Sequence, residues 1–161
     1  DSLVSAKLAD GNKELLVATK FGKAIRFKEG DVRASNRGSM GVKAISLNMG
    51  DELISMDVIS PDSDSTLLTI TNQGYGKRTE LEEYPQQRRG GKGVKNIDAR
   101  KGFVCCTTTV SEEDELLVTT KEGVMIRIPA SEIRVQGRST QGVRIMNVKP
   151  GDEVAAVARI T

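Results

Sequence analysis

The residue types best suited to bind a charged ligand form the run Gln87-Arg88-Arg89-Gly90-Gly91-Lys92-Gly93, which holds three cations, three glycines and no acid. Glycine has no side chain and tolerates positive φ, so a polyanion can reach the backbone N–H groups. The planar guanidinium of arginine can bind a phosphate through two hydrogen bonds. The run therefore favours a phosphate-binding loop. A flexible solvated turn is the alternative for any basic, glycine-rich run.

Charge is unevenly distributed along the chain. Between Gln86 and Lys101, six cations stand against the single acid Asp98. Acids gather elsewhere, as in the run Glu112-Glu113-Asp114-Glu115. The net charge of +2 thus conceals a segregation that predicts one basic and one acidic surface.

Composition excludes several classes of function. Aromatic residues make up 3% of the chain, with no Trp, so no stacking platform for single strands is expected. There is no His, and the adjacent Cys105 and Cys106 point to opposite faces of a strand, so neither a zinc site nor an unstrained disulfide is expected. We interpret both as ordinary strand residues in a reducing compartment. Without a Gly-Lys-Ser/Thr loop or other catalytic constellation, we expect no catalytic site and no cofactor.

No signal peptide is recognisable, and no apolar run approaches the ~20 residues that a membrane helix needs. We therefore expect no membrane partner and a cytoplasmic protein.

Three copies of one unit account for the organisation of the chain. Leu15–Arg26, Leu67–Arg78 and Leu116–Arg127 each combine a β-rich run, a turn with glycine at a fixed place, and a second run ending in arginine. This pattern predicts β-hairpins. The turn glycines, Gly22, Gly74 and Gly123, recur about 50 residues apart, as expected for propeller-type repeats.

Two further elements recur in phase with the hairpins. One is a strand that opens with glycine and carries a cation two residues later, at Gly41-Val42-Lys43, Gly93-Val94-Lys95 and Gly142-Val143-Arg144. The other is Gly50–Ile54 and Gly151–Ala155, with the divergent Lys101–Cys105 between them; its Asp51 and Asp152 are expected to be turn residues. We predict an all-β, pinwheel- or propeller-like array of about three four-stranded blades.

The expected blades are residues 14–60, residues 66–111, which carry the basic run, and residues 115–161. Acidic, polar loops separate them at 60–65 and 111–115, and single helical turns are possible at 29–34, 80–84 and 130–134. Residues 1–10 match the closing strand of a unit, since Leu3–Leu8 resembles Leu53–Val58. We expect the whole chain to be one fragment of a longer array.

Equivalent positions of the units carry cations that would form a basic belt. The cations are Arg37 and Lys43, then Arg88, Arg89, Lys92 and Lys95, then Arg138 and Arg144, with Arg26, Arg78 and Arg127 at the hairpin ends. Duplex DNA carries one charge per ~1.7 Å of axis, so it suits a belt better than a pocket. Such contacts carry little base information. The alternative is that each cation only solubilises the edge of a blade.

The basic run and the Gly-Val-Lys strand after it resemble the C-terminal domain of the DNA gyrase A subunit, whose seven-residue box matches Gln87–Gly93 at every position. The segments Gly74–Thr79 and Gly137–Arg144 resemble its later repeats, and the resemblance covers nearly the whole chain, at about half of that domain. It implies a β-pinwheel with strands exchanged between blades, and duplex DNA bound and wrapped on the basic rim. The implied DNA contacts are Gln87, Arg88, Arg89, Gly90, Gly91, Lys92, Gly93 and Lys95, with Arg37, Lys43, Arg78, Arg138 and Arg144.

The resemblance also implies partners: the remainder of the gyrase A subunit and, through it, the gyrase B subunit, in a bacterial nucleoid-associated enzyme that introduces negative supercoils using ATP. Two alternatives stay open. One is the C-terminal domain of topoisomerase IV, against which the complete box argues. The other is a protein-interaction propeller for an acidic partner, which would not explain the glycines between the box cations.

Overall fold

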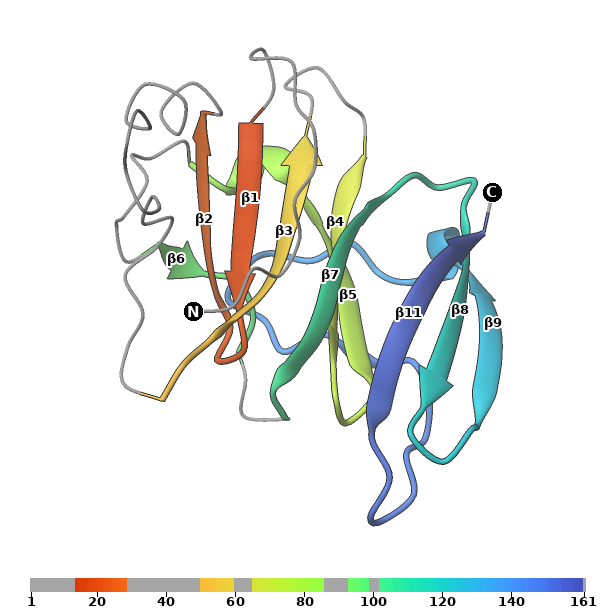
Figure 1. Ribbon diagram of the computed structural model, residues 1–161. Helices are drawn as coiled ribbons and strands as arrows, with labels where there is room; N and C mark the ends of the chain where they lie inside the picture. Colours follow the sequence, from red (N-terminus) through yellow and green to blue (C-terminus); the bar gives the residue numbers. More distant parts are fainter. Residues whose placement is uncertain (1–13, 29–49, 60–64, 86–92, 99–101, 161) are drawn as a thin grey trace, which may run out of the picture.

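The structure, a computed structural model, describes residues 14–28, 50–59, 65–85, 93–98 and 102–160. These residues form strands, single 3-10 turns and loops, with no α-helix among them. Their strands make three antiparallel sheets that lie side by side (Figure 1). The prediction of an all-β array built from hairpin units is confirmed.

Each sheet is centred on one predicted hairpin. The first has the order β3-β1-β2-β6, from Leu53–Ile59, Glu14–Thr19, Lys23–Lys28 and Val94–Lys95. The second has the order β7-β4-β5-β10, from Val104–Val110, Thr66–Thr71, Tyr75–Glu80 and Val143–Arg144. The third has the order β11-β8-β9, from Val154–Ile160, Glu115–Thr120 and Met125–Pro129. Single 3-10 turns at Leu81–Glu83 (η1) and Ala130–Glu132 (η3) fall where helical turns were predicted.

A threonine and a glycine shape every hairpin turn. The turn glycines adopt φ of 92°, 88° and 93°, a region that residues with a Cβ rarely enter. Each donates its N–H to the carbonyl of the threonine that ends the preceding strand, as Gly22 does to Thr19. The Oγ1 of that threonine accepts the N–H of the residue after the glycine, as from Lys23 to Thr19 at 3.1 Å. The same pair of bonds recurs at Thr71 and Thr120, so the turns are nearly identical.

The sheets do not coincide with the sequence repeats. The strand β6 belongs to the second repeat but pairs with β2 of the first, with Lys23 opposite Lys95 and Ala24 opposite Val94. Likewise β10 of the third repeat pairs with β5 of the second. Each of these strands completes the sheet of the preceding unit. The strand exchange that the family resemblance implied is therefore present.

The core lies within and between the sheets. The central strands β1 and β4 are buried along their whole length, because sheet neighbours flank them and both faces are covered. At the opposite edge from the exchanged strands, β3 contacts β7, and β7 contacts β11 (Figure 1). Backbone bonds join the units here, from Val104 N to Lys20 O at 2.9 Å and from Val154 N to Asn72 O at 2.8 Å.

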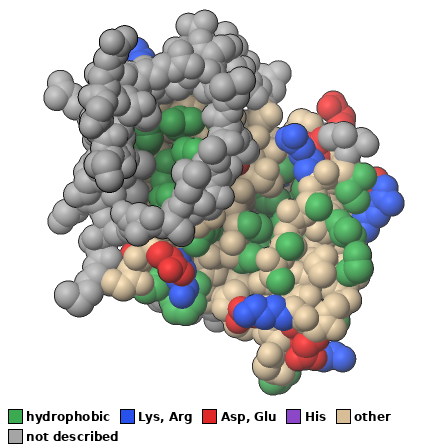
Figure 2. Space-filling model, in the orientation of Figure 1, with side chains coloured by type: hydrophobic (Ala, Val, Ile, Leu, Met, Phe, Trp, Pro, Cys, Tyr) green, Lys and Arg blue, Asp and Glu red, His purple; other side chains and the backbone are tan. Residues whose placement is uncertain are grey.

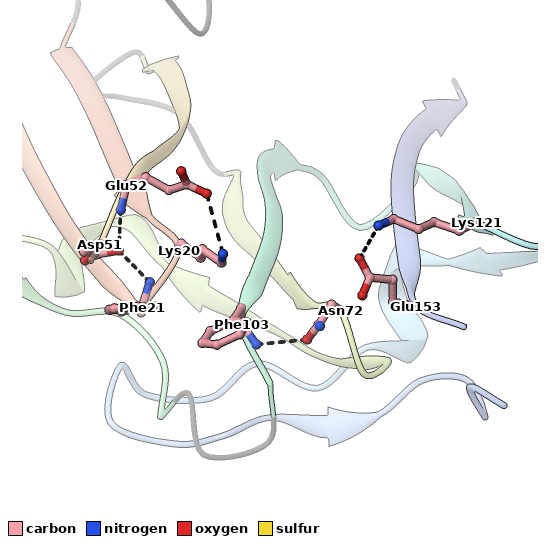
Figure 3. Close-up of polar contacts among 8 residues, drawn as sticks. All are labelled: Lys20, Phe21, Asp51, Glu52, Asn72, Phe103, Lys121 and Glu153. Carbon is pink, nitrogen blue, oxygen red and sulfur yellow. Dashed lines mark hydrogen bonds and ion pairs between the residues drawn. The ribbon is translucent and has the colours of Figure 1, made fainter. Parts of the chain in front are cut away.

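The strands at the edge opposite the exchanged ones, β3, β7 and β11, are called the inner strands here. Polar contacts fix the hairpin tips against the start of these inner strands (Figure 3). The Asp51 Oδ1 accepts the N–H groups of Phe21 (2.9 Å) and Glu52 (2.8 Å). Asp152 accepts those of Glu122 and Glu153 in the same way. Both aspartates are turn residues, as predicted.

The second unit makes an equivalent contact, but the side-chain acceptor lies on the hairpin tip instead of just before the inner strand. Gly102 stands where the other units have aspartate, and Asn72, on the hairpin tip, supplies the acceptor, with its Oδ1 2.9 Å from Phe103 N. A Cβ on Gly102 would lie 2.4 Å from this oxygen, so the two departures depend on each other.

The expected closing strand at residues 1–10 and the possible turn at 29–34 lie outside the described residues.

Gly142, at the entrance to β10, yields a stability prediction. Its φ is +84°, and a Cβ there would lie 2.7 Å from the Gly76 carbonyl oxygen. Gly123 has φ of +93° but nothing within 4 Å of a Cβ. Because left-handed backbone costs a side-chain-bearing residue about 1–2 kcal/mol, Gly123→Ala should lose about that much stability, and Gly142→Ala should lose more. Urea unfolding of both variants measures the difference; equal losses would contradict the close approach of β10 to β5.

Candidate nucleic-acid interface

Cations from different units meet at the outer edge formed by the exchanged strands. Lys23 on β2 lies directly opposite Lys95 on β6. Like charges placed directly opposite each other across two strands are destabilising. Neither lysine has an ion pair with an acid in the part of the chain that the structure describes. The pair therefore places two positive charges beside each other at this edge.

Arg138 of the third unit joins this pair. Its Nη1 donates to the Lys95 carbonyl oxygen at 3.0 Å, which places the guanidinium beside the outer strand of the first sheet. Its Nε has no hydrogen-bond partner among the described residues. Lys23, Lys95 and Arg138, hereafter the edge cluster, thus bring together one cation from each of the three units.

Arg144 occupies the equivalent place on the second sheet. It lies opposite Tyr75, with its guanidinium carbon 5.2 Å from the ring centroid. Its Nη2 donates to Tyr75 Oη at 2.9 Å and its Nη1 to Asn147 Oδ1 at 3.3 Å. The side chain stays exposed. These contacts hold the guanidinium in one orientation without neutralising its charge.

The loop that carries Arg138 is the third unit's counterpart of the basic run. Gln136–Gly142 begins with glutamine and ends with glycine before a Val-cation pair, as Gln87–Gly93 does, and Arg138 stands where the run has Arg89. Gln136 N donates to Arg78 O at 2.7 Å, and Asp98 N donates to Thr140 O at 3.0 Å. The loop therefore lies between β5 and the segment that follows β6.

A buried lysine, Lys77, is hydrogen-bonded to the backbone of this loop. The Lys77 Nζ donates to the carbonyls of Gly137 (2.7 Å), Arg138 (3.0 Å) and Thr140 (3.0 Å). It also contacts Thr140 Oγ1 at 3.2 Å. The side chain is fully buried. Burial lowers the pKa of Lys77 from 10.5 to about 8, opposed in part by the charge of Glu83. One ammonium group thus fixes the backbone on which Arg138 is mounted.

Both flanks of the basic run are anchored to each other. Tyr84, before the run, donates its Oη to Asn96 Oδ1, after the run, at 2.5 Å. Asn96 Nδ2 donates onward to Thr69 Oγ1 at 3.1 Å. Tyr84 and Asn96 are buried, and burial raises the pKa of Tyr84. The third unit has Ile133 and Ile145 at these positions, so the polar pair is specific to the unit with the complete box.

Two of the hairpin-end arginines, Arg26 and Arg78, do not belong to the outer edge. The Arg78 side chain is 4% exposed, its Nε donates to Ile133 O at 2.7 Å, and its Nη1 lies 4.0 Å from Glu112. Arg26 bonds Leu81 O at 2.8 Å and pairs with Glu14. Both reach a carbonyl at the 3-10 turn of the next unit. Arg78 was expected to contact DNA, but its burial leaves little of it for a phosphate, so we remove it from the expected set.

The other predicted contacts are distributed as follows. Lys95, Arg138 and Arg144 lie at the outer edge, and Gly93, with φ of +76°, leads into β6. Outside the described residues lie Gln87, Arg88, Arg89, Gly90, Gly91, Lys92, Arg37 and Lys43.

Sequence reasoning missed Lys23 and Lys77. The signal for Lys77 was its place in the repeat, since the first and third units have Ile25 and Ile126 there. A lysine at an isoleucine position implies a buried ammonium with specific acceptors.

Several described cations elsewhere are paired with acids, although Lys28, Arg134 and Lys149 have no ion pair with a described acid. On the face shown in Figure 2, Lys and Arg side chains around the third sheet lie beside Asp or Glu side chains. Pairs of this kind are Lys121 with Glu153 at 2.7 Å and Arg127 with Glu115 at 2.6 Å. The edge cluster differs from them because it has no ion pair with an acid among the described residues.

These features define a strand-exchanged, propeller-type array with a basic outer edge. The family described as "DNA gyrase C-terminal domain, beta-propeller" matches residues 13–60, 65–102 and 114–161. The chain belongs to this family.

The curated relatives point to the same family. The chain is 41% identical over 162 residues to the DNA gyrase A subunit of Staphylococcus epidermidis, covering 99% of this chain and 18% of the relative. It is 40% identical to the DNA gyrase A subunit of Haloquadratum walsbyi, covering 98% of this chain and 19% of the relative. The chain thus spans about a fifth of the length of these curated relatives.

Among solved structures, a C-terminal domain of DNA topoisomerase IV superposes with a TM-score of 0.86 at 25% identity, covering 96% of this chain and 48% of that one. A DNA gyrase A C-terminal domain superposes with a TM-score of 0.82 at 28% identity, covering 93% of this chain and 51% of that one. The β-pinwheel prediction is confirmed, and this chain corresponds to about half of either domain.

Within the described residues, no helix is long and apolar enough to cross a membrane.

The buried Lys77 predicts a pH dependence of stability. Its pKa is about 8 in the folded protein and 10.5 ordinarily, so between these values the unfolded chain holds more protons. The Lys77 contribution to the free energy of unfolding should therefore rise as the pH increases from about 8 to about 10. Urea unfolding of the parent and of Lys77→Met across this pH range measures this contribution. Subtracting the two free energies of unfolding cancels the contributions of the other titrating groups. A difference that stays constant with pH would contradict a desolvated ammonium at this position.

Proposed function

We propose that this chain binds duplex DNA along its outer edge, without sequence specificity, as part of a gyrase A subunit. The observation that carries the proposal is the edge cluster, in which Lys23 and Lys95 face each other and Arg138 adjoins them. Such an arrangement costs stability unless an anion shares it. A phosphate backbone is an anion that could reach all three.

The arrangement of cations favours an extended polyanion over a small anion. The edge cluster lies on the outer strand of the first sheet, and Arg144 lies on that of the second. Small anions are usually bound in concave sites by convergent groups. Cations repeated along successive sheet edges instead suit the repeated charges of a duplex.

The basic run adds to this surface. Its flanking residues Val94 and Lys95 lie in β6, so the chain leaves the run at the outer edge, next to Lys23. The run also supplies Arg88, Arg89 and Lys92. Contacts of this kind bind phosphates and leave base edges unread, which is why we propose no sequence preference.

We further propose that the parent protein wraps DNA on this surface to support ATP-dependent negative supercoiling. The support is membership of the gyrase C-terminal domain family and similarity to gyrase A subunits. The implied partners are the remainder of the gyrase A subunit and, through it, the gyrase B subunit, in the bacterial cytoplasm at the nucleoid. Bending 20–30 bp of duplex by 40–90° costs on the order of 1–6 kcal/mol, so wrapping requires many such contacts.

The topoisomerase IV counterpart remains the second candidate, because a solved domain of that enzyme superposes well. The complete box in residues 87–93 favours gyrase.

The salt dependence of binding tests the proposal. Each lost phosphate contact should flatten the slope of log affinity against log salt by ~0.9 on linear duplex DNA. Lys23→Ala/Lys95→Ala should therefore lose up to ~1.8 units of slope, and Arg88→Ala/Arg89→Ala/Lys92→Ala about two to three units. Fluorescence anisotropy with a labelled duplex, titrated across salt, provides the measurement.

A matched control removes the same charge elsewhere. Lys121→Ala/Arg127→Ala deletes two cations that are already paired with Glu153 and Glu115. This variant should keep the parental slope. If it loses as much slope as Lys23→Ala/Lys95→Ala, the protein binds through diffuse charge and the proposed edge is wrong.

The length of the contact surface predicts a limited topological effect. Three units provide a short arc, so the isolated chain should bind DNA but constrain little writhe. Relaxation of a bound plasmid by a topoisomerase I, followed by deproteinisation and gel analysis, measures the constrained writhe. Efficient, chiral wrapping by this chain alone would show that fewer contacts suffice than we propose.

A further inference from the structure

The inner strand of every sheet carries a β-bulge at the same place. In the first sheet, the pairing with β1 moves from Ser55 to Leu53 and skips Ile54. In the third, the pairing with β8 moves from Ala156 to Val154 and skips Ala155. In the second, the pairing with β4 moves from Cys106 to Val104 and skips Cys105. The bulge is thus a feature of the unit, and only in the second unit does it hold two cysteines.

The bulge brings both cysteines to one face of the second sheet. Cys106 lies opposite Ile70, whose side chain belongs to the apolar cluster between the second and third sheets. Thr107 points the other way, where its Oγ1 contacts Ser55 at 2.5 Å and Asp57 at 3.0 Å. In a regular strand Cys105 would share the face of Thr107. It packs instead against the same apolar cluster as Cys106.

Two further observations agree with this placement. Interaction with the neighbouring thiol lowers the pKa of Cys105, and the same interaction together with burial raises the pKa of Cys106. Neither cysteine forms a disulfide, and both keep part of their surface exposed. The expectation that neighbouring cysteines point to opposite faces therefore fails at this bulge, because the inserted residue breaks the alternation.

We propose that Cys105 and Cys106 form a dithiol site for trivalent arsenicals. These species bind soft sulfur ligands, and two thiols on one face can hold one arsenic atom together. With an arsenoxide R–As=O, two S–H bonds and the As=O bond break, two As–S bonds form, and the oxygen leaves as water with both protons. Arsenic stays trivalent, so no oxidant or reductant is needed. The site lies on an inner strand and is independent of the proposed DNA function.

Phenylarsine oxide is the probe for the test, with the full 161-residue chain. Intact-protein mass spectrometry should show one phenylarsenic group per chain with two thiol protons lost. Excess dithiol should remove the adduct, whereas a monothiol at the same thiol concentration should not. Cys105→Ser and Cys106→Ser should each bind roughly 10²–10⁴-fold more weakly, since the second bond is intramolecular only in the pair. Failure of the parent to form the adduct overturns the proposal.

A transplant tests the role of the bulge. In a Cys105→Thr/Cys106→Thr background, Ala155→Cys/Ala156→Cys places two thiols at the bulge of the third sheet. Thr108→Cys/Thr109→Cys places them on β7 where the pairing with Leu68 and Leu67 is regular. The first variant should regain dithiol-reversible binding and the second should not. Equal binding by both variants would overturn the proposal that the bulge creates the site.

Discussion

The carbonyls of two hairpin glycines, Gly22 and Gly74, hold the segment that directly follows the exchanged strand of the next unit. Gly22 O accepts the N–H groups of Asn96 (2.6 Å) and Ile97 (3.3 Å), and Gly74 O accepts those of Ile145 (2.8 Å) and Met146 (3.4 Å). These bonds form only because the turn glycine adopts positive φ and the entering segment approaches closely. The exchange forces each connecting segment to cross a unit boundary and to arrive at the outer edge. For this reason the basic run, which directly precedes β6, ends at the outer edge, where Lys23 of the preceding unit lies opposite Lys95.

Cations at similar-looking positions consequently have different roles. Arg26 and Arg78 end their hairpin strands beside the 3-10 turn of the next unit, so their guanidinium groups bond its carbonyls and hold the units together. Lys23 and Lys95 lie at the start of the exchanged pairing, where no ion pair with a described acid neutralises them. A guanidinium with several fixed acceptors is well suited to the first role, because its donors are arranged in a planar fork. The repeat therefore separates cations that join units from cations that remain available to a ligand.

Much of this fold was predictable because its determinants are local. Recurring glycine and threonine fix the hairpin turns, and the turn aspartates follow from their position after glycine. The strand exchange is not local: a two-residue strand such as Val94–Lys95 pairs equally well with either neighbour on pattern alone, and the family resemblance was needed to assign it. At the candidate site, Lys95, Arg138 and Arg144 lie at the outer edge because they recur with the exchanged strand, and their contact with DNA stays a prediction. Arg78 was included among the expected DNA contacts and Lys77 was overlooked, since the hairpin pattern does not show that both of these adjacent cations are buried. The cysteines were misjudged because strict alternation does not hold at a bulge.

The second unit departs from its neighbours at interior positions that touch the loops. Lys77 replaces isoleucine, Tyr84 and Asn96 replace Ile133 and Ile145, and each of these polar groups has a partner. Buried polar groups cost stability when unpaired but fix a unique geometry when fully bonded. Here the bonded atoms are the carbonyls of the loop that carries Arg138 and the two flanks of the basic run. Apolar replacements would pack the same volume, but they would leave those backbone segments without a fixed position. The polar interior of the second unit is therefore explained by the need to fix the backbone on either side of glycine-containing, cationic segments, and this unit is the one that carries the complete box.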